Sequence, residues 1–113
     1  MTRNSKKYLF DILSCIKDIQ NQHLFEVQNI QDFENDKTIM RAVERELEII
    51  GEAAYRLRQM GVNLMQADSL INRRNTIIHQ YDSFQPRTIW YFIKQQLPEL
   101  ETEVQDLLKS NDE

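Results

Sequence analysis

Apolar residues recur every three or four positions in several stretches of this chain, which is the spacing of helices that bury one face. The first stretch runs from Lys6 to about Gln22, and its apolar positions are Leu9, Ile12, Leu13, Ile16 and Ile19. Between His23 and Asp36 the apolar residues are spaced irregularly, so we expect a connection with about one helical turn. We expect His23 at the surface or at the boundary of the core, and not as a ligand.

A second helix follows this connection. Asn35 or Asp36 is suited to cap its N-terminus, and the pattern predicts that it ends near Gln59. Gly61 then supplies the left-handed conformation that ends many helices. The apolar positions form a seam with steps of three and four residues, typical of helical bundles: Met40, Val43, Leu47, Ile50, Ala54 and Leu57.

Gly51 lies inside this predicted helix, where glycine costs about 1 kcal/mol relative to alanine. We therefore expect a neighbouring segment to approach the helix backbone closely at this point. Ile49 and Ala53 lie off the apolar seam. Two interpretations are open for them: scattered exposed apolar residues, which are common, or a second buried face that contributes to a subunit interface.

Two further helices are predicted in the C-terminal half. The third follows a short loop at residues 62–66, with Asp68 or Ser69 as its cap, and extends to about Gln80. The fourth begins at Gln85–Pro86, because proline is favoured in the first turn of a helix. Pro98 is expected to kink the fourth helix, since it removes a backbone donor. Its apolar positions are Ile89, Trp90, Phe92, Ile93, Leu97, Leu100, Val104, Leu107 and Leu108.

Glycine and proline are scarce, with two of each in 113 residues, and this favours long helices with few turns. We predict one all-α domain over residues 1–113, an antiparallel bundle of four to five helices. No stretch is apolar enough to span a membrane or to serve as a signal-peptide core, and the single Cys15 can form no internal disulfide. We therefore expect a cytoplasmic protein without a membrane partner, with Cys15 as a buried apolar filler.

Charge is unevenly distributed along the chain. Fourteen basic and 18 acidic side chains give 14 − 18 = −4, which argues weakly against nonspecific binding to nucleic acid. Residues 73–94 nevertheless carry four basic side chains against Asp82 alone, a local charge of 4 − 1 = +3. The centre of the chain is therefore basic.

The chemistry that the sequence offers is concentrated in the third predicted helix, between Arg73 and Tyr81. On an ideal helix Arg74 and His79 lie roughly 140° apart, whereas Asn75 and His79 share a face. In one copy of the helix, the side chains of Arg74 and His79 are therefore poorly placed to contact the same small target. Two copies packed about a two-fold axis could place two arginines and two histidines around one cleft.

These residue types suit transesterification at an RNA phosphodiester. Histidine is a general base near neutral pH and could activate the 2′-hydroxyl, while arginine could stabilise the negative charge of a phosphorane. Metal-ligand spacings, a glycine-rich phosphate loop and a nucleophile elbow are all missing from the sequence. We therefore expect no metal and no cofactor. A surface role for Arg74 and a core-edge role for His79 are the alternative.

Residues 74–81, with the sequence RNTIIHQY, resemble the Arg-x4-His-x-Tyr signature of HepT-like toxins in the HEPN superfamily. Residues 47–54 (LEIIGEAA) are similar to the family's second helix, residues 97–100 (LPEL) to its C-terminal turn, and residues 11–13 (DIL) to its opening helix. The similarity covers nearly the whole chain in the right order.

The resemblance implies an all-helical two-fold dimer that acts as a metal-independent endoribonuclease toxin. It makes Arg74 and His79 the catalytic pair and Asn75 an orienting neighbour. It also implies a minimal nucleotidyltransferase as the cognate antitoxin, which can transfer AMP to the signature tyrosine, here Tyr81. The added charge and bulk would repel RNA and crowd Arg74.

Other assignments stay open. Arg73 could hold the RNA backbone or be solvated surface, and Glu52 could orient Arg74 or His79 or lie on a solvated helix face. The alternative function is a non-catalytic helical adaptor that binds a nucleotidyltransferase and positions nucleotide or substrate. A purely structural bundle is a third possibility.

Overall fold

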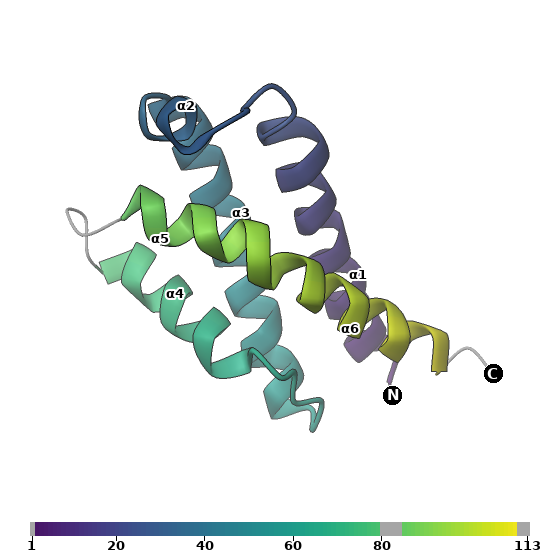
Figure 1. The fold of residues 1–113 in the computed structure, drawn as a ribbon. Coiled ribbons are helices and arrows are strands. Elements are labelled where there is room, and N and C mark those ends of the chain that lie inside the picture. The colour runs from purple at the N-terminus through teal and green to yellow at the C-terminus, as the bar shows by residue number, and fades with distance from the viewer. Residues whose placement is uncertain (1, 80–84, 111–113) are drawn as a thin grey trace.

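The fold is that of a computed structural model, which describes residues 2–79 and 85–110, apart from the side chain of residue 79. Five helical segments and no strand lie in these ranges (Figure 1). They are α1 (Arg3–Asp18) continued by the π turn η1 (Ile19–His23); α2 (Ile30–Glu34); α3 (Lys37–Gln59); α4 (Ala67–His79); and α5 (Pro86–Tyr91), the π turn η2 (Phe92–Gln96) and α6 (Leu97–Ser110) in one continuous run. The predicted all-α class and number of helices are confirmed.

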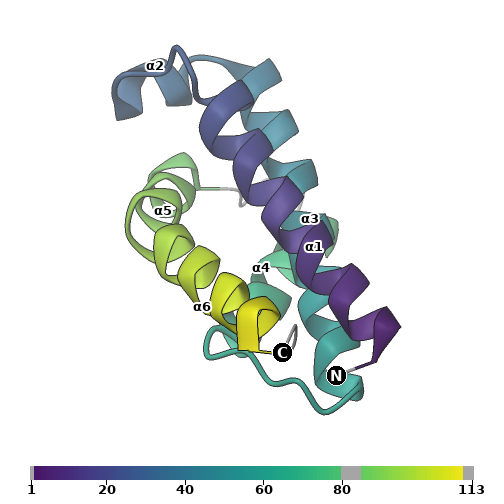
Figure 2. The same ribbon diagram turned by 90° about the vertical axis from the view of Figure 1, so that its right-hand side faces the viewer.

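Helix α3 lies at the centre of the arrangement. It packs against α1 on one side and α4 on the other, while α6 packs on α1 and the short α2 contacts α3 and α5. Successive long helices reverse direction, and the start of α1 and the end of α6 lie at the same end of the molecule (Figures 1 and 2). No helix in the described ranges is long and apolar enough to cross a membrane.

The predicted apolar stripes form one core. Most of the seam positions of α3 are almost fully buried, and only Met40 is partly exposed. Phe33 of α2 is fully buried and packs against Trp90 of α5, with ring centroids 5.6 Å apart. The buried residues of the long helices include Leu9, Ile12, Ile16 and Ile19 from the first, and Leu97, Leu100, Val104 and Leu108 from the last.

Short polar side chains fix the helix ends. The carboxylate of Asp36 accepts a hydrogen bond from the backbone N–H of Ile39 at 3.0 Å, so the predicted cap of α3 is confirmed. Gly61 has a φ of 83°, the left-handed conformation expected after this helix. The predicted cap of α4 is wrong, because the helix already begins at Ala67. Asp68 lies in its first turn and accepts a hydrogen bond from Arg58 of α3 instead of capping.

Pro98 does not end the last helix. The π turn η2 comes directly before the proline, and the residues at its two borders, Tyr91 and Leu97, keep right-handed helical dihedrals. Because proline cannot donate the usual backbone hydrogen bond, the regular hydrogen-bond pattern of the helix is interrupted here, next to the π turn. The chain therefore continues from α5 through η2 into α6 without an intervening loop.

Candidate functional site

Helices α3 and α4 approach each other closely at Gly51. A Cβ atom built at Gly51 would lie 2.5 Å from the Cβ of Arg74 and 2.8 Å from the carbonyl oxygen of Leu70. No side chain fits at such distances, so glycine is needed for α4 to lie where it does. The close approach predicted at Gly51 is confirmed, and the helix that makes it is the one that carries Arg74.

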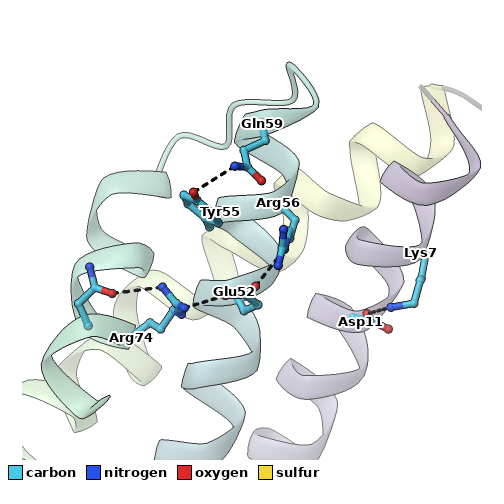
Figure 3. Close-up of polar contacts among 8 residues, drawn as sticks. Lys7, Asp11, Glu52, Tyr55, Arg56, Gln59 and Arg74 are labelled. Atoms are coloured by element: carbon cyan, nitrogen blue, oxygen red, sulfur yellow. Dashed lines mark hydrogen bonds and ion pairs between the residues drawn. The ribbon is translucent and has the colours of Figure 1, made fainter. Parts of the chain in front are cut away.

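Arg74 is held in place by its neighbours. Its Nη2 lies 2.9 Å from Oε2 of Glu52, and its Nη1 donates a hydrogen bond to Oδ1 of Asn75 at 3.2 Å. The other carboxylate oxygen of Glu52 accepts a hydrogen bond from Nε of Arg56 at 3.0 Å (Figure 3). A guanidinium has five N–H donors, so these contacts orient Arg74 and, among the described residues, leave donors free for a ligand. The side chain of Arg74 is 28% exposed, so the protein covers most of it while part still reaches solvent.

A groove of about 300 Å³ lies beside Arg74, between α1, α3 and α4. Ile49 and Ile78 are unusually exposed for large apolar residues, at 40% and 38%. Ala53, in contrast, is only 2% exposed, because its own chain already covers it, so it adds almost no surface for a partner. The groove is lined by Tyr8, Asp11, Glu48, Ile49, Glu52, Ala53, Arg74 and Ile78.

Arg73 does not join this site. Its guanidinium carbon lies 4.2 Å from the ring centroid of Phe92, on another side of α4, beside a separate cavity of about 370 Å³. The Nε atom is buried without a hydrogen-bond partner among the described residues, and burial lowers the pKa of the group. Arg73 is therefore not plain solvated surface, and it does not line the groove beside Arg74.

Two predicted site residues, His79 and Tyr81, remain. His79 is the last residue of this helix, and its side chain is not among those described. Tyr81 lies outside the described residues. The pairing of Arg74 with His79 and the role of Tyr81 stay predictions.

Arg56 is a part of the site that the sequence analysis did not assign. It follows Glu52 by four residues, the spacing at which side chains meet on one face of a helix, and this spacing was the available signal. In the described ranges no three His, Cys, Asp or Glu side chains are grouped closely enough to hold a metal ion. The expectation that the protein uses no metal stays a prediction.

A second polar cluster lies apart from the groove, where η1 meets α3. Oε1 of Glu46 is 4.0 Å from Nε2 of His23, and Oε2 of Glu46 is buried without a partner among the described residues. Burial, with a further contribution from Asp18, raises the pKa of Glu46. Cys15 is also buried, and burial followed by the nearby Glu46 raises its pKa to about 12, so it is an unreactive core residue as predicted.

Fold and site define an all-helical domain with an arginine held at a groove, as expected for the HEPN superfamily. The sequence model of the family described as ribonuclease HepT-like matches residues 12–107. The chain belongs to this family.

Several relatives match along nearly their whole length. One from Methanocaldococcus jannaschii, named as an inferred RNase, is 33% identical over 115 residues, covering 98% of this chain and 97% of the relative. A second protein of that organism with the same kind of name is 32% identical over 111 residues, covering 95% and 89%. A probable ribonuclease HepT from Thermococcus cleftensis is 31% identical over 115 residues, covering 96% and 100%. No solved structure matches the chain.

Proposed function

We propose that this protein is a metal-independent endoribonuclease, the toxin of a two-gene system whose antitoxin is a minimal nucleotidyltransferase. Arg74 carries the proposal. It belongs to the RNTIIHQY segment at residues 74–81, and Glu52 and Asn75 hold it at the mouth of a groove with donors to spare. Three relatives named as ribonucleases, together with the ribonuclease HepT-like family model, support RNA as the substrate.

The reaction is an attack by RNA on its own backbone. His79 takes the proton of a 2′-hydroxyl, and the 2′-oxygen forms a bond to the adjacent phosphorus. The guanidinium of Arg74 stabilises the additional negative charge on the five-coordinate phosphorane. The bond to the 5′-oxygen then breaks, and a second imidazole donates the proton to this leaving group. The products are a 2′,3′-cyclic phosphate and a 5′-hydroxyl.

The second imidazole comes from a second copy of the chain. Arg74 and His79 lie roughly 140° apart around α4, so one helix does not aim both at the same phosphate. The exposed Ile49 and Ile78 flank the groove and give a two-fold partner an apolar surface to cover. The dimer places one set of residues from each subunit around a shared cleft.

The antitoxin acts on a residue that follows this helix in the sequence. In the proposed pair the nucleotidyltransferase transfers AMP to the hydroxyl of Tyr81, two residues after His79. An added phosphate beside the site repels the RNA backbone and competes for Arg74. The modification therefore switches off cleavage without unfolding the toxin.

Incubation of the purified protein with RNA in the presence of a chelator tests the proposal. The parent is expected to release fragments ending in 2′,3′-cyclic phosphate. His79→Ala should lower the rate by about 10²–10⁴-fold and Arg74→Gln by about 10²–10³-fold. Arg41→Gln is the matched control, since Arg41 is an exposed arginine of α3 that lines neither the groove nor the cavity beside Arg73.

Circular dichroism shows whether each variant is folded. If His79→Ala is folded and cleaves as fast as the parent, the mechanism is wrong. If the parent cleaves no RNA at any concentration but binds a nucleotidyltransferase, the chain is the non-catalytic adaptor.

A further inference from the structure

The cavity beside Arg73 is separate from the groove of Arg74 and has a different character. Its polar walls are the side chains of Ser69, Asn72, Arg73, Thr76, Gln85 and Thr88, from α4 and the start of α5. Ile77 and Ile89 add apolar surface. At about 370 Å³ the cavity is within the range of small-ligand sites, which combine apolar walls with a few placed polar groups.

Charge decides which ligand suits this cavity. Arg73 is its one ionisable lining residue among those described, and the other polar walls are neutral hydroxyls and amides. No carboxylate of the described residues pairs with Arg73, and its Nε is buried without a partner. A half-buried cation in this state gains from a bound anion, because a guanidinium forms strong paired hydrogen bonds with phosphate.

Arg73 is also fixed in position. Its guanidinium lies against the face of the Phe92 ring at 4.2 Å, a contact that restricts the side chain and keeps it at the cavity wall. A restrained arginine loses little conformational entropy when it binds a ligand. Neutral hydroxyl and amide groups around it match the sugar hydroxyls and base edges of a nucleotide.

The register of α4 connects this cavity with the proposed catalytic face. At about 100° per residue, Arg73 and Arg74 leave the helix about 100° apart, and the buried Leu70 lies on the core side between them. Position 79 falls on the outer side, roughly 120° from Arg73 and roughly 140° from Arg74. A strand that crosses the outer side of α4 therefore runs from the groove of Arg74, past position 79, to the cavity of Arg73.

We propose that the cavity lined by Arg73, Asn72, Thr76 and Thr88 is a nucleotide-binding subsite whose arginine holds a phosphate next to the cleaved bond. The assignment rests on the proposed function for the identity of the strand as RNA. Arg73 anchors the substrate, while the phosphate that reacts is held by Arg74.

Binding is measured in the His79→Ala background, so that RNA is not consumed, by fluorescence anisotropy with a short labelled single-stranded oligoribonucleotide. Adding Arg73→Gln should weaken binding about tenfold. It should also reduce the slope of log K against log salt by about 0.7, the share of one phosphate contact on a single strand. Arg41→Gln, which removes one exposed charge elsewhere on α3, should change affinity less than twofold.

Thr88→Met separates a binding role of the cavity from a structural role of Arg73. It narrows the cavity and leaves the contact of Arg73 with Phe92 intact, so affinity should fall while the salt slope stays unchanged. If circular dichroism shows that Arg73→Gln is unfolded, the affinity of Thr88→Met alone tests the proposal. Affinities for both RNA and AMP equal to those of the parent in the folded variants would overturn the proposal.

Two further measurements show which ligand fills the subsite and whether the subsite exists independently of the proposed function. Labelled AMP binding that is lost in Arg73→Gln, with RNA binding unchanged, assigns the subsite to a free nucleotide; loss of RNA binding assigns it to the strand. Cleavage is followed in parallel with His79 present, and Arg73→Gln should raise KM and leave kcat within about twofold. A parent that binds through Arg73 but never cleaves would refute the proposed function and retain the subsite.

Discussion

Gly51 and Arg74 lie so close that a methyl group on the glycine would sit 2.5 Å from the Cβ of the arginine. Gly51, which has a low helix propensity within α3, thus makes the contact that sets the position of the site. Two rigid atoms, the Arg74 Cβ and the Leu70 carbonyl oxygen, occupy the space, so a side chain at position 51 must displace α4.

Gly51→Ala is therefore expected to destabilise the protein, although alanine is the better helix former. The propensity gain of about 1 kcal/mol is outweighed by overpacking of about 1–3 kcal/mol, and the displaced Arg74 should lower RNA cleavage as well. Thermal melting and the cleavage rate measure the two effects.

Gly61→Ala is the matched control for Gly51→Ala. No atom of the described residues lies within 4 Å of a Cβ at Gly61, but its φ of 83° strains any other residue. It should lower stability by about 1 kcal/mol and leave the rate per folded molecule unchanged. Unchanged stability and cleavage in Gly51→Ala would contradict the close-approach explanation.

Glu52→Gln tests whether the ion pair with Arg74 positions the arginine. Both side chains are more than a quarter exposed, so stability should change by less than about 1 kcal/mol. The cleavage rate should fall by about 10–100-fold, because a misplaced group loses most of its effect. The kinetic measure is a double-mutant cycle: Glu52→Gln should add nothing in the Arg74→Gln background. Independent, multiplying effects would show that Glu52 acts in another way.

Ile49→Glu tests the groove as a subunit interface. A carboxylate placed on a surface that a partner covers should weaken the dimer at least tenfold, since the charge would be buried without a partner. Light scattering coupled to size exclusion measures the molecular mass, and circular dichroism checks the fold. Met65→Glu is the control, because Met65 is 92% exposed and lies outside the groove. An Ile49→Glu protein with the mass of the parent would exclude this interface.

Stability should depend on pH through Glu46. Its folded pKa is raised above the ordinary 4.5, so between the two values the native state binds more protons than the unfolded state. Stability conferred by this group is therefore present at low pH and is lost as pH rises through the folded pKa. Glu46→Gln should remove this fall, measured by urea denaturation from pH 4.5 upward. A variant that keeps the full decline would show that other groups cause it.

Much of the fold could be predicted from the sequence because its signals are periodic and local. The steps of three and four along α3 identify the buried seam, and Asp36 and Gly61 mark its ends by their own chemistry. The start of α4 was misplaced since Asp68, a good capping residue, instead pairs with an arginine of another helix. The local sequence pattern does not show which distant residue a side chain pairs with.

The candidate site was predictable in part for the same reason. Gly51 indicated that a neighbour comes close, but the identity of that neighbour depends on how α3 and α4 pack. Arg73 and Arg74 are adjacent in the sequence but lie on different sides of α4. Arg73 contacts Phe92, whereas Arg74 pairs with Glu52. Ala53 lies off the seam, yet α3 is covered on more than one side, so it is buried within one chain.

The claim that two subunits combine their residues in one cleft is tested most directly by mixing two inactive variants. Arg74→Gln keeps the imidazole, and His79→Ala keeps the guanidinium. Refolding them together gives mixed dimers, whose formation native mass spectrometry verifies. We predict that the mixture recovers part of the RNA cleavage, because each mixed dimer holds one guanidinium and one imidazole in the shared cleft, while the missing second imidazole keeps the rate below that of the parent. Mixed dimers as inactive as the separate variants would contradict a shared site.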